Sequence, residues 1–319
     1  CIATGMHALA DVLAGIIVYT AVVRMRLIWD RLRNASERIA NSWKEWRIGA
    51  VRIINHGGYA GAGTFIGLSI IGIFLGETYI LYIQIVAFSA LILSALWAQY
   101  IEGSPSLLRP YGYYGGVLGI FAGTFIAYLL GADLWLLLGG FAVAAPWIQA
   151  LGRMRCLVQG CCHGREAPLT VGIRYVHPRS RVCRLSGLAN VPVHPTPLYS
   201  ILWNVFTEII LVRLWFLYAS PALIGGIYLI LNGTGRFVEE SYRGEPQTPM
   251  LGKLRLYQWL AIASVMAGAV ITTLEPSSAI PVPHFNWPSV FAAAGFGLAT
   301  WIALGVDFPE SNKRFSRLV

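Results

Sequence analysis

The chain has 319 residues, of which 56% are hydrophobic and 12% are charged, and its formal net charge is +9. Soluble globular domains carry about 25% charged residues, so this composition excludes an ordinary soluble domain and indicates a polytopic membrane protein. The positive charge is expected to face anionic lipid rather than nucleic acid, because no basic run is interleaved with aromatic residues on a soluble region.

Apolar runs of helix-forming length follow one another along the chain. They lie at 7–23, 59–76, 79–99, 115–131, 134–150, 197–218, 222–237, 257–271 and 290–306. Helical runs of about 17–21 residues are just long enough to cross a hydrocarbon core of roughly 30 Å. The pattern therefore predicts an all-α integral membrane protein with about eight transmembrane helices.

Two basic polar segments interrupt the apolar runs. Residues 24–52 carry eight Lys and Arg together with three tryptophans, which predicts a basic amphipathic helix on the membrane surface. The positive-inside rule places this segment in the cytoplasm. The second segment, 152–195, lies on the same side if every apolar run spans. It lies on the opposite side if the Gly-rich run 59–76 is re-entrant, and both topologies remain open.

Arginines at the end of one apolar helix and within another apolar run are the first candidate site. An arginine at the bilayer centre costs about 2.5–3.5 kcal/mol on insertion scales, so Arg153 and Arg236 should face a polar cavity or a partner. Glu240 and Arg243 share a helix face with Arg236. Guanidinium groups suit a lipid phosphate, which favours an anion site. The alternative is an Arg–Glu pair that holds helices together, or arginines that reach the interface.

The segment 152–164, GRMRCLVQGCCHG, also concentrates cysteines. Cys156, Cys161, Cys162 and His163 have the spacing C-x4-C-C-H, which is not a standard zinc pattern. Small buried cysteines that pack against glycine are the favoured interpretation. We therefore expect no metal and no cofactor at this segment.

Two further motifs lie next to apolar runs. Gly115 and Gly116 follow a group of tyrosines, whose hydroxyls could contact a phosphate or move a proton, although the spacing alone favours an aromatic belt with close helix packing. His194 begins the block HPTPLY after the second polar segment. It could be an acid–base group or a capping residue, and both roles remain open.

Taken in order, four blocks resemble the prolipoprotein diacylglyceryl transferase family. They are YGGVLG at 114–119, the segment 152–164, HPTPLY at 194–199, and the helix at 228–243 that carries Arg-Phe-x-x-Glu-x-x-Arg; residues 252–258 resemble the block that follows. The likeness covers roughly residues 7–275, and the Cys-Cys form of the second block resembles a divergent branch.

The resemblance implies an all-helical, multi-pass enzyme of the bacterial inner membrane. Such an enzyme transfers the diacylglyceryl group of phosphatidylglycerol to the cysteine thiol of a lipoprotein precursor peptide and releases glycerol phosphate, with membrane lipids around it. Residues 1–275 would form the transferase-like transmembrane domain. Residues 276–319 would add a linker, an extra C-terminal span and a tail.

The resemblance also implies a set of site residues. Arg153 and Arg236 would grip the phosphate and stabilise charge on the leaving group, and Tyr114 and His194 would complete the catalytic set. Glu240 would orient Arg236, and Gly164 would give room for the lipid head group. The implied substrate-binding residues are Gly115, Gly116, Gly152, Cys156, Gly160, Gly164, Tyr199, Asn232, Glu240 and Arg243.

Four departures from the family pattern leave alternatives open. Tyr114 replaces a histidine, Cys156 an asparagine, Cys161 a glutamate and Asn232 a tyrosine. Tyrosine is a poor base at neutral pH, so the acceptor thiol would need another activating group. One alternative is therefore a transferase that uses a different acceptor. Another is a catalytically silent, lipid-binding homologue that serves as a structural subunit alongside partner chains of a membrane complex.

Overall fold

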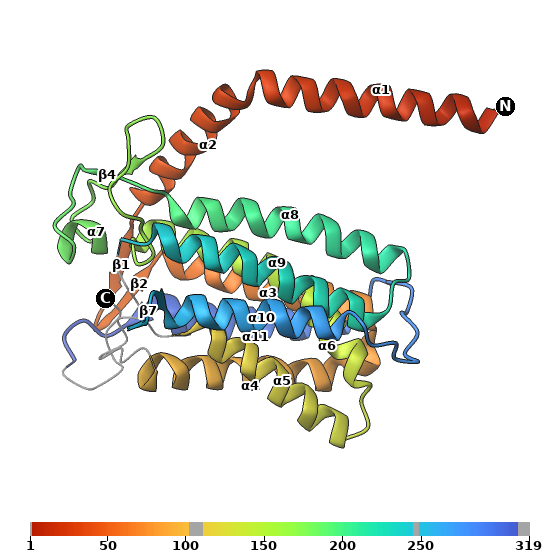
Figure 1. The fold of residues 1–319 in the computed structure, drawn as a ribbon. Helices are drawn as coiled ribbons and strands as arrows, with labels where there is room; N and C mark the ends of the chain where they lie inside the picture. The colour runs from red at the N-terminus through yellow and green to blue at the C-terminus, as the bar shows by residue number, and fades with distance from the viewer. Residues whose placement is uncertain (1, 102–110, 245–248, 312–319) are drawn as a thin grey trace.

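The computed structural model describes residues 2–101, 111–244 and 249–311, and it is mostly helical. Long helices lie side by side in a bundle, and the short strands and loops gather at one end of it (Figure 1). The bundle helices are α3 (His56–Leu75), α4 (Ile80–Tyr100), α5 (Tyr113–Leu129), α6 (Leu134–Gln159), α8 (Thr196–Phe216), α9 (Pro221–Tyr242), α10 (Leu256–Ile271) and α11 (Trp287–Gly305).

Five helical segments among the described residues are long and apolar enough to cross a membrane. They are α3, α4 with the short 3-10 helix η1 (Glu77–Tyr79), α6, α8 and α11. A sixth results if Asp11–Thr20 and Met25–Ala40, bent by 62° at their break, count as one span. The apolar helices α5 and α10 are shorter. The prediction of a multi-pass helical membrane protein is confirmed, and run 59–76 lies within one unbroken helix, α3.

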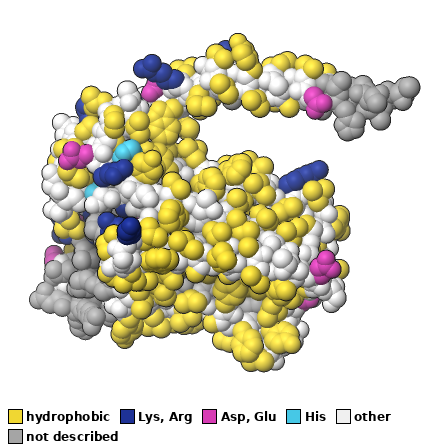
Figure 2. Space-filling model, in the orientation of Figure 1, with side chains coloured by type: hydrophobic (Ala, Val, Ile, Leu, Met, Phe, Trp, Pro, Cys, Tyr) yellow, Lys and Arg dark blue, Asp and Glu magenta, His cyan; other side chains and the backbone are white. Residues whose placement is uncertain are grey.

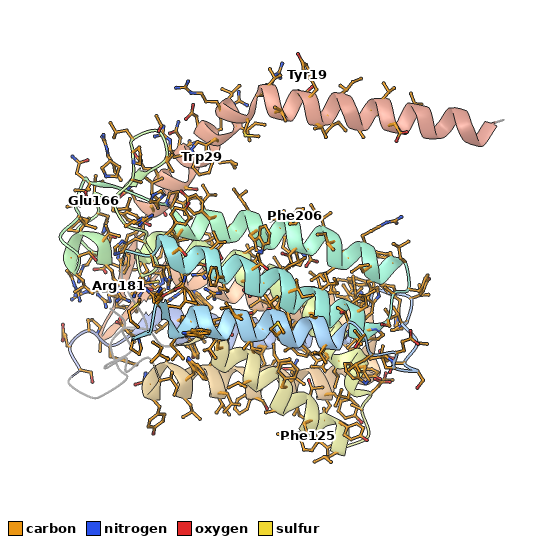
Figure 3. The ribbon with its side chains drawn as sticks, in the orientation of Figure 1. Tyr19, Trp29, Phe125, Glu166, Arg181 and Phe206 are labelled. Atoms are coloured by element: carbon orange, nitrogen blue, oxygen red, sulfur yellow. The ribbon has the colours of Figure 1, made fainter. Side chains whose placement is uncertain are left out.

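Apolar side chains cover both the inside and the outside of the bundle. Ile71, Leu137 and Trp215 are fully buried between helices. Phe125 on α5 and Phe206 on α8 point outward and are 55% and 50% exposed (Figure 3). Much of the bundle surface is likewise apolar (Figure 2). Because a soluble protein does not expose so much contiguous apolar surface, this outer surface is suited to lipid.

Glycines let neighbouring helices approach closely, as is typical of membrane bundles. A Cβ atom on Gly119 of α5 would lie 2.4 Å from the Cα of Ala90 on α4. A Cβ on Gly61 of α3 would lie 2.8 Å from the carbonyl oxygen of Gly297 on α11. The C-terminal helix α11 is therefore packed closely against α3.

The N-terminal segment differs from the prediction of one amphipathic helix over 24–52. Helix α1 (Ile2–Val23) leads into α2 (Met25–Ala40), which ends well before Trp43. A hairpin follows, formed by β1 (Glu45–Ile48) and β2 (Val51–Ile54), and β2 also pairs antiparallel with β7 (Val306–Asp307). The two-residue turn contains Gly49 at φ +59°, which fits a hairpin turn better than a helix.

Helix α2 packs against the polar loop instead of lying free on a surface. The Asn41 side-chain amide donates to the Arg174 carbonyl at 2.8 Å, and its oxygen accepts from the Val176 amide at 2.8 Å. The loop carries three short elements, and a last hairpin precedes α10. These are β3 (Ile173–Arg174), α7 (Arg181–Arg184), β4 (Pro192–Val193), β5 (Met250–Leu251) and β6 (Leu254–Arg255).

Candidate functional site: an arginine cluster between two polar cavities

Helix α6 is longer than its apolar run predicts, and this length positions the first site residue. Asp133 caps its N-terminus by accepting from the Leu136 amide at 3.0 Å. The helix continues past residue 150 to Gln159, where Gly160 ends it in the left-handed conformation at φ +72°. Arg153 and Cys156 are therefore held on the last turns of this helix.

Three arginines converge on one carboxylate, that of Glu239 on α9. The Arg153 guanidinium contacts Glu239 Oε2 at 2.9 Å, and Arg236 contacts the same oxygen at 3.3 Å. Arg243 lies 3.6 Å from Glu239 Oε1. Arg153 also donates through Nε to Ser200 Oγ on α8 at 3.1 Å. The carboxylate thus ties α6 to both arginines of α9.

The expectation that Glu240 orients Arg236 is wrong, because Glu239 does so. Glu240 instead lies 3.5 Å from Arg243 and 4.0 Å from Arg255. Residues three and four apart can both reach Arg236 along a helix, so sequence spacing does not separate the two carboxylates. The position of Arg153 does separate them, because Arg153 on the facing helix α6 lies on the side of α9 that carries Glu239.

Positive charge is in surplus at this cluster. Arg153, Arg155, Arg236 and Arg243 all line one polar cavity of about 280 Å³. Arg155 is only 8% exposed, and its Nε and one terminal nitrogen have no hydrogen-bond partner among the described residues. Buried cations without partners are costly, and they persist where an anion binds. The charge of this cavity therefore suits an anion.

A second cavity reaches the same cluster from another side. This side cavity has a volume of about 490 Å³ and contains His194, Tyr199, Asn232 and Glu239 in its wall. Arg236 and Gln149 line both cavities. Asn232 donates to the Gln149 side chain at 3.0 Å, which holds the amide in place. One guanidinium is thus approachable from two directions.

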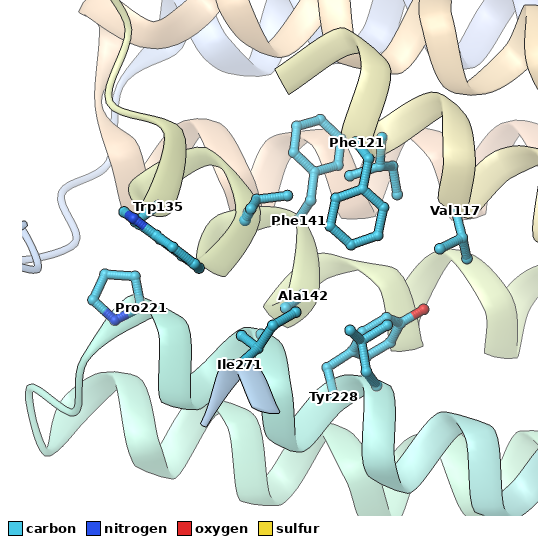
Figure 4. Close-up of a pocket in the computed structure, with 12 residues that line it drawn as sticks. Val117, Phe121, Trp135, Phe141, Ala142, Pro221, Tyr228 and Ile271 are labelled. Carbon is cyan, nitrogen blue, oxygen red and sulfur yellow. The ribbon is translucent and has the colours of Figure 1, made fainter. Parts of the chain in front are cut away.

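Apolar space continues from the polar cavity into the bundle. A cavity of about 320 Å³ between α3, α4, α5 and α6 shares Tyr113, Gln149 and Gly152 with the polar cavity. Beyond it, a small pocket of about 40 Å³ is enclosed by α5, α6, α9 and α10 (Figure 4). Phe141 and Tyr228 line both apolar spaces. A ligand with a charged head and hydrocarbon tails would fit this sequence of polar and apolar walls.

Tyr113, not Tyr114, faces the arginine cluster. The Arg236 guanidinium carbon lies 4.2 Å from the centre of the Tyr113 ring, and the Tyr113 hydroxyl is 3.3 Å from that of Tyr228. The Tyr114 hydroxyl instead donates to the Tyr257 carbonyl at 3.3 Å, in a buried position. The expected catalytic place of Tyr114 is thus contradicted by its direction, since consecutive helix residues point about 100° apart.

The glycines expected to bind substrate serve different purposes. A Cβ on Gly115 would lie 2.4 Å from the Leu93 carbonyl oxygen, so Gly115 packs α5 on α4. A Cβ on Gly164 would lie 2.7 Å from the His194 carbonyl oxygen, so the space at Gly164 is filled by the chain itself and not by a head group. Gly152 has nothing within 4 Å and lines the polar and apolar cavities, and Gly116 lines the apolar one.

His194 and Tyr199 lie together in the wall of the side cavity, at the start of α8. His194 Nδ1 is 3.0 Å from the Tyr199 hydroxyl, and the ring packs against Tyr242. Burial, followed by the charge of Arg165, holds the pKa of His194 below its ordinary value. A neutral imidazole at pH 7 can accept a proton, so His194 keeps the capacity of a base.

Three cysteines form a cluster in the polar cavity. Because Gly160 reverses the chain, Cys161 and Cys162 return towards Cys156, and their three sulfur atoms lie within 4.8 Å of one another. Arg243 donates to Cys162 Sγ at 3.6 Å. Hydrogen bonds with Cys156 and then Cys161 hold the pKa of the Cys162 thiol well below its ordinary value, and Arg243 and Arg153 add to this effect. His163 points away, towards Ser186.

Together these features define an α-helical membrane protein with a buried cationic cavity that opens into apolar space, suited to an anionic lipid. The sequence profile of the prolipoprotein diacylglyceryl transferases matches residues 111–274, and the chain belongs to this family of membrane transferases. That stretch includes Arg153, Arg236 and Glu239 and leaves out α1 to α4 and α11.

Curated relatives agree with the family. The chain is 25% identical over 187 residues to the phosphatidylglycerol–prolipoprotein diacylglyceryl transferase of Clostridium tetani, covering 55% of this chain and 70% of the relative. It is 25% identical over 190 residues to phosphatidylglycerol–prolipoprotein diacylglyceryl transferase 2 of Clostridium perfringens, covering 56% of this chain and 69% of the relative. Its identity to the phosphatidylglycerol–prolipoprotein diacylglyceryl transferase of Bacillus cereus is 28% over 182 residues, covering 54% of this chain and 65% of the relative.

Proposed function

We propose that this protein transfers the diacylglyceryl group of phosphatidylglycerol to the cysteine thiol of a lipoprotein precursor and releases glycerol phosphate. The observation that carries the proposal is the convergence of Arg153, Arg236 and Arg243 on Glu239 beside a continuous apolar space. The names of the relatives support the same substrates. We further infer that it acts in the bacterial inner membrane, among membrane lipids.

In the proposed complex, the lipid phosphate lies against the arginines and the acyl chains occupy the apolar cavity. The acceptor sulfur forms a bond to the terminal glycerol carbon of the diacylglyceryl group, and the bond from that carbon to the phosphate oxygen breaks. The electron pair of that bond leaves with glycerol phosphate. The arginines stabilise the charge that grows on the leaving phosphate, which is the largest electrostatic demand of the reaction.

Arg236 is the residue best suited to this role. It lines both polar cavities, and its guanidinium is fixed from one side by the Tyr113 ring and from another by Glu239. A fixed guanidinium loses little conformational freedom when a phosphate binds, so its interaction energy is available to the transition state. Arg153 is fixed in the same way by Glu239 and Ser200.

The test is a transfer assay with the purified full-length chain in vesicles that contain phosphatidylglycerol. A peptide with a lipoprotein-type cysteine is added, and glycerol phosphate release and the mass of the peptide are measured. We expect both products in equal amounts, and neither with the Arg236→Ala variant. Arg47→Ala, a change at a half-exposed arginine on β1, is the matched control and should keep full activity.

Three other outcomes separate the alternatives. Release of glycerol phosphate without a change in peptide mass would overturn the peptide as acceptor and favour another one. Lipid binding without any release would favour a silent, lipid-binding homologue with partner chains. Unchanged lipid binding and release in Arg236→Ala would show that the arginine is structural, and would overturn the assigned site.

A further inference from the structure

The cysteine cluster of Cys156, Cys161 and Cys162 has no part in the reaction proposed above. Cys156 ends the polar face of α6, and Cys161 and Cys162 follow the reversal at Gly160. All three line the same cavity as Arg153 and Arg243. Spacing along the chain gave no reason to expect a metal here, because the reversal that brings the sulfurs together is a feature of the fold.

The sulfur positions match the geometry of a tetrahedral zinc site. Zinc–sulfur bonds of about 2.3 Å at tetrahedral angles place two ligand sulfurs about 3.8 Å apart. Cys161 Sγ and Cys162 Sγ are 3.8 Å apart, and the three sulfurs all lie within 4.8 Å.

The surroundings also suit a thiolate-bound metal. Arg243 donates to Cys162 Sγ, and such a hydrogen bond stabilises a coordinated thiolate. A zinc ion with three thiolates carries one net negative charge, as does a phosphodiester. These two charges balance the surplus of two positive charges left when four cavity arginines are set against Glu239 and Glu240.

We propose that Cys156, Cys161 and Cys162 bind one zinc ion whose fourth position is open to the arginine cavity and takes the acceptor thiol. Among the described residues, no fourth His, Cys, Asp or Glu belongs to the group of ligand atoms. Three protein ligands and one open position are the pattern of catalytic rather than structural zinc. The binding site stands by itself, whereas its role in acceptor activation rests on the proposed function.

The proposed role replaces the missing base. A thiol that coordinates zinc gives up its proton to solvent and binds as the thiolate. The thiolate sulfur then attacks the glycerol carbon, the carbon–oxygen bond breaks, and the phosphate oxygen keeps the electron pair. Arg243 contacts both Cys162 and Glu239, so the metal and the phosphate-binding arginines adjoin each other.

The first test measures metal and needs no activity. Full-length protein is purified under reducing conditions, loaded with Zn²⁺, dialysed and analysed by mass spectrometry of the metal. We expect about one zinc per chain in the wild type, and less than about a tenth of that in a triple variant Cys156→Ser, Cys161→Ser, Cys162→Ser. Cys183→Ser is the matched control, because Cys183 Sγ donates to the Tyr175 carbonyl outside the cluster.

Two readouts keep this test decisive if the triple variant folds poorly. Single Cys156→Ser and Cys162→Ser variants are compared by their thermal unfolding, and only folded variants are scored. Co²⁺ in place of zinc should give the absorption bands of a tetrahedral, sulfur-bound ion in the wild type, and these bands should shift when a thiol peptide is added. Equal zinc in the wild type and the triple variant, or loss of zinc in Cys183→Ser alone, would overturn the site.

The second test separates the metal from the transferase. Removal of zinc with a chelator should lower peptide modification at least tenfold, and added Zn²⁺ should restore it. Full transfer by zinc-free protein would overturn the role in activation while the proposed function stands. One zinc per chain with cobalt bands, but no transfer under any condition, would support the metal site and overturn the proposed function.

Discussion

Two buried arginine sites in this molecule differ in charge balance. At the polar end, Arg52 on β2 meets Asp307 on β7 through two hydrogen bonds of 2.9 and 2.6 Å. Both side chains are buried, and neither lines any of the cavities described above. In the cluster around Glu239, three arginines share one carboxylate beside open space. The matched charges at Arg52 stabilise the fold, whereas the surplus positive charge around Glu239 can bind an anionic ligand in the cavity.

The largest expected effects on activity come from Arg236, as described above, and from Arg153. Replacement by alanine removes a fixed guanidinium from the phosphate site, and we expect glycerol phosphate release to fall about 100- to 1,000-fold. Glu239 keeps two other arginines, so the thermal unfolding midpoint should change little. The assay and the unfolding curve are measured on one preparation. A large loss of stability with activity per folded molecule intact would reverse the assignment.

Arg52→Ala should have the opposite effect. Its removal breaks the buried, two-point ion pair with Asp307 and the 3.5 Å contact with Glu45, which should cost about 3–5 kcal/mol of stability. The unfolding midpoint should therefore drop, while the activity of the folded fraction at low temperature stays near that of the wild type. Equal losses of activity in Arg52→Ala and Arg153→Ala would remove the distinction between the two sites.

A smaller effect is expected at the carboxylates, where Glu239→Gln should lower activity about 10- to 100-fold through the loss of two charged hydrogen bonds. Glu240→Gln should cost less, because its contacts to Arg243 and Arg255 are 3.5 and 4.0 Å long. The ratio of kcat/KM between the two variants measures which carboxylate orients the cluster. A stronger effect at Glu240 would contradict the observed geometry.

Variants of the two neighbouring tyrosines, Tyr113 and Tyr114, should also differ in activity, by a smaller amount than the carboxylate variants. Tyr113→Leu removes the ring beneath Arg236, a cation–π contact that contributes about 0.5–2 kcal/mol, so activity should fall about 2- to 30-fold. Tyr113→Phe should restore most of it, since the ring is kept. Tyr114→Phe should leave activity unchanged, which is the outcome least compatible with Tyr114 as a catalytic group.

The smallest expected effect concerns pH and His194. Its pKa is lower in the folded protein than in the unfolded chain, because burial and then Arg165 disfavour the charged ring. The unfolded state therefore binds protons more readily, and stability should decrease as the pH falls below about 6.5. His194→Gln should flatten this decrease in unfolding curves recorded at pH 7 and pH 5. An identical slope in both proteins would remove His194 as the titrating group.

Periodicity and motif order were enough to predict the bundle helices and to single out Arg153, Arg236 and Arg243, because an arginine at the end of an apolar helix or inside it has few structural explanations. They were not enough to choose Glu239 over Glu240 or Tyr113 over Tyr114. In both cases neighbouring residues on one helix differ only in what faces them, and that depends on the packing of α6 and α5 against α9. The third strand of the sheet, β7, was missed because it lies more than 250 residues along the chain from its partner β2.

Gly164 lies where three segments of the chain meet, and backbone hydrogen bonds join these segments to one another. The amide of Gly164 donates to the His194 carbonyl, and that of Arg165 to the Tyr242 carbonyl, each at 2.9 Å. In addition, the His194 amide donates to the Arg165 carbonyl at 2.9 Å, and the Gly244 amide donates to the His163 carbonyl at 3.1 Å. These hydrogen bonds fix the base of the polar loop that follows Gly160 to the end of α9. A peptide that pulls on this loop would therefore move the backbone that carries the guanidinium cluster, and amide exchange at this crossing should be slow even where the loop beyond it exchanges quickly.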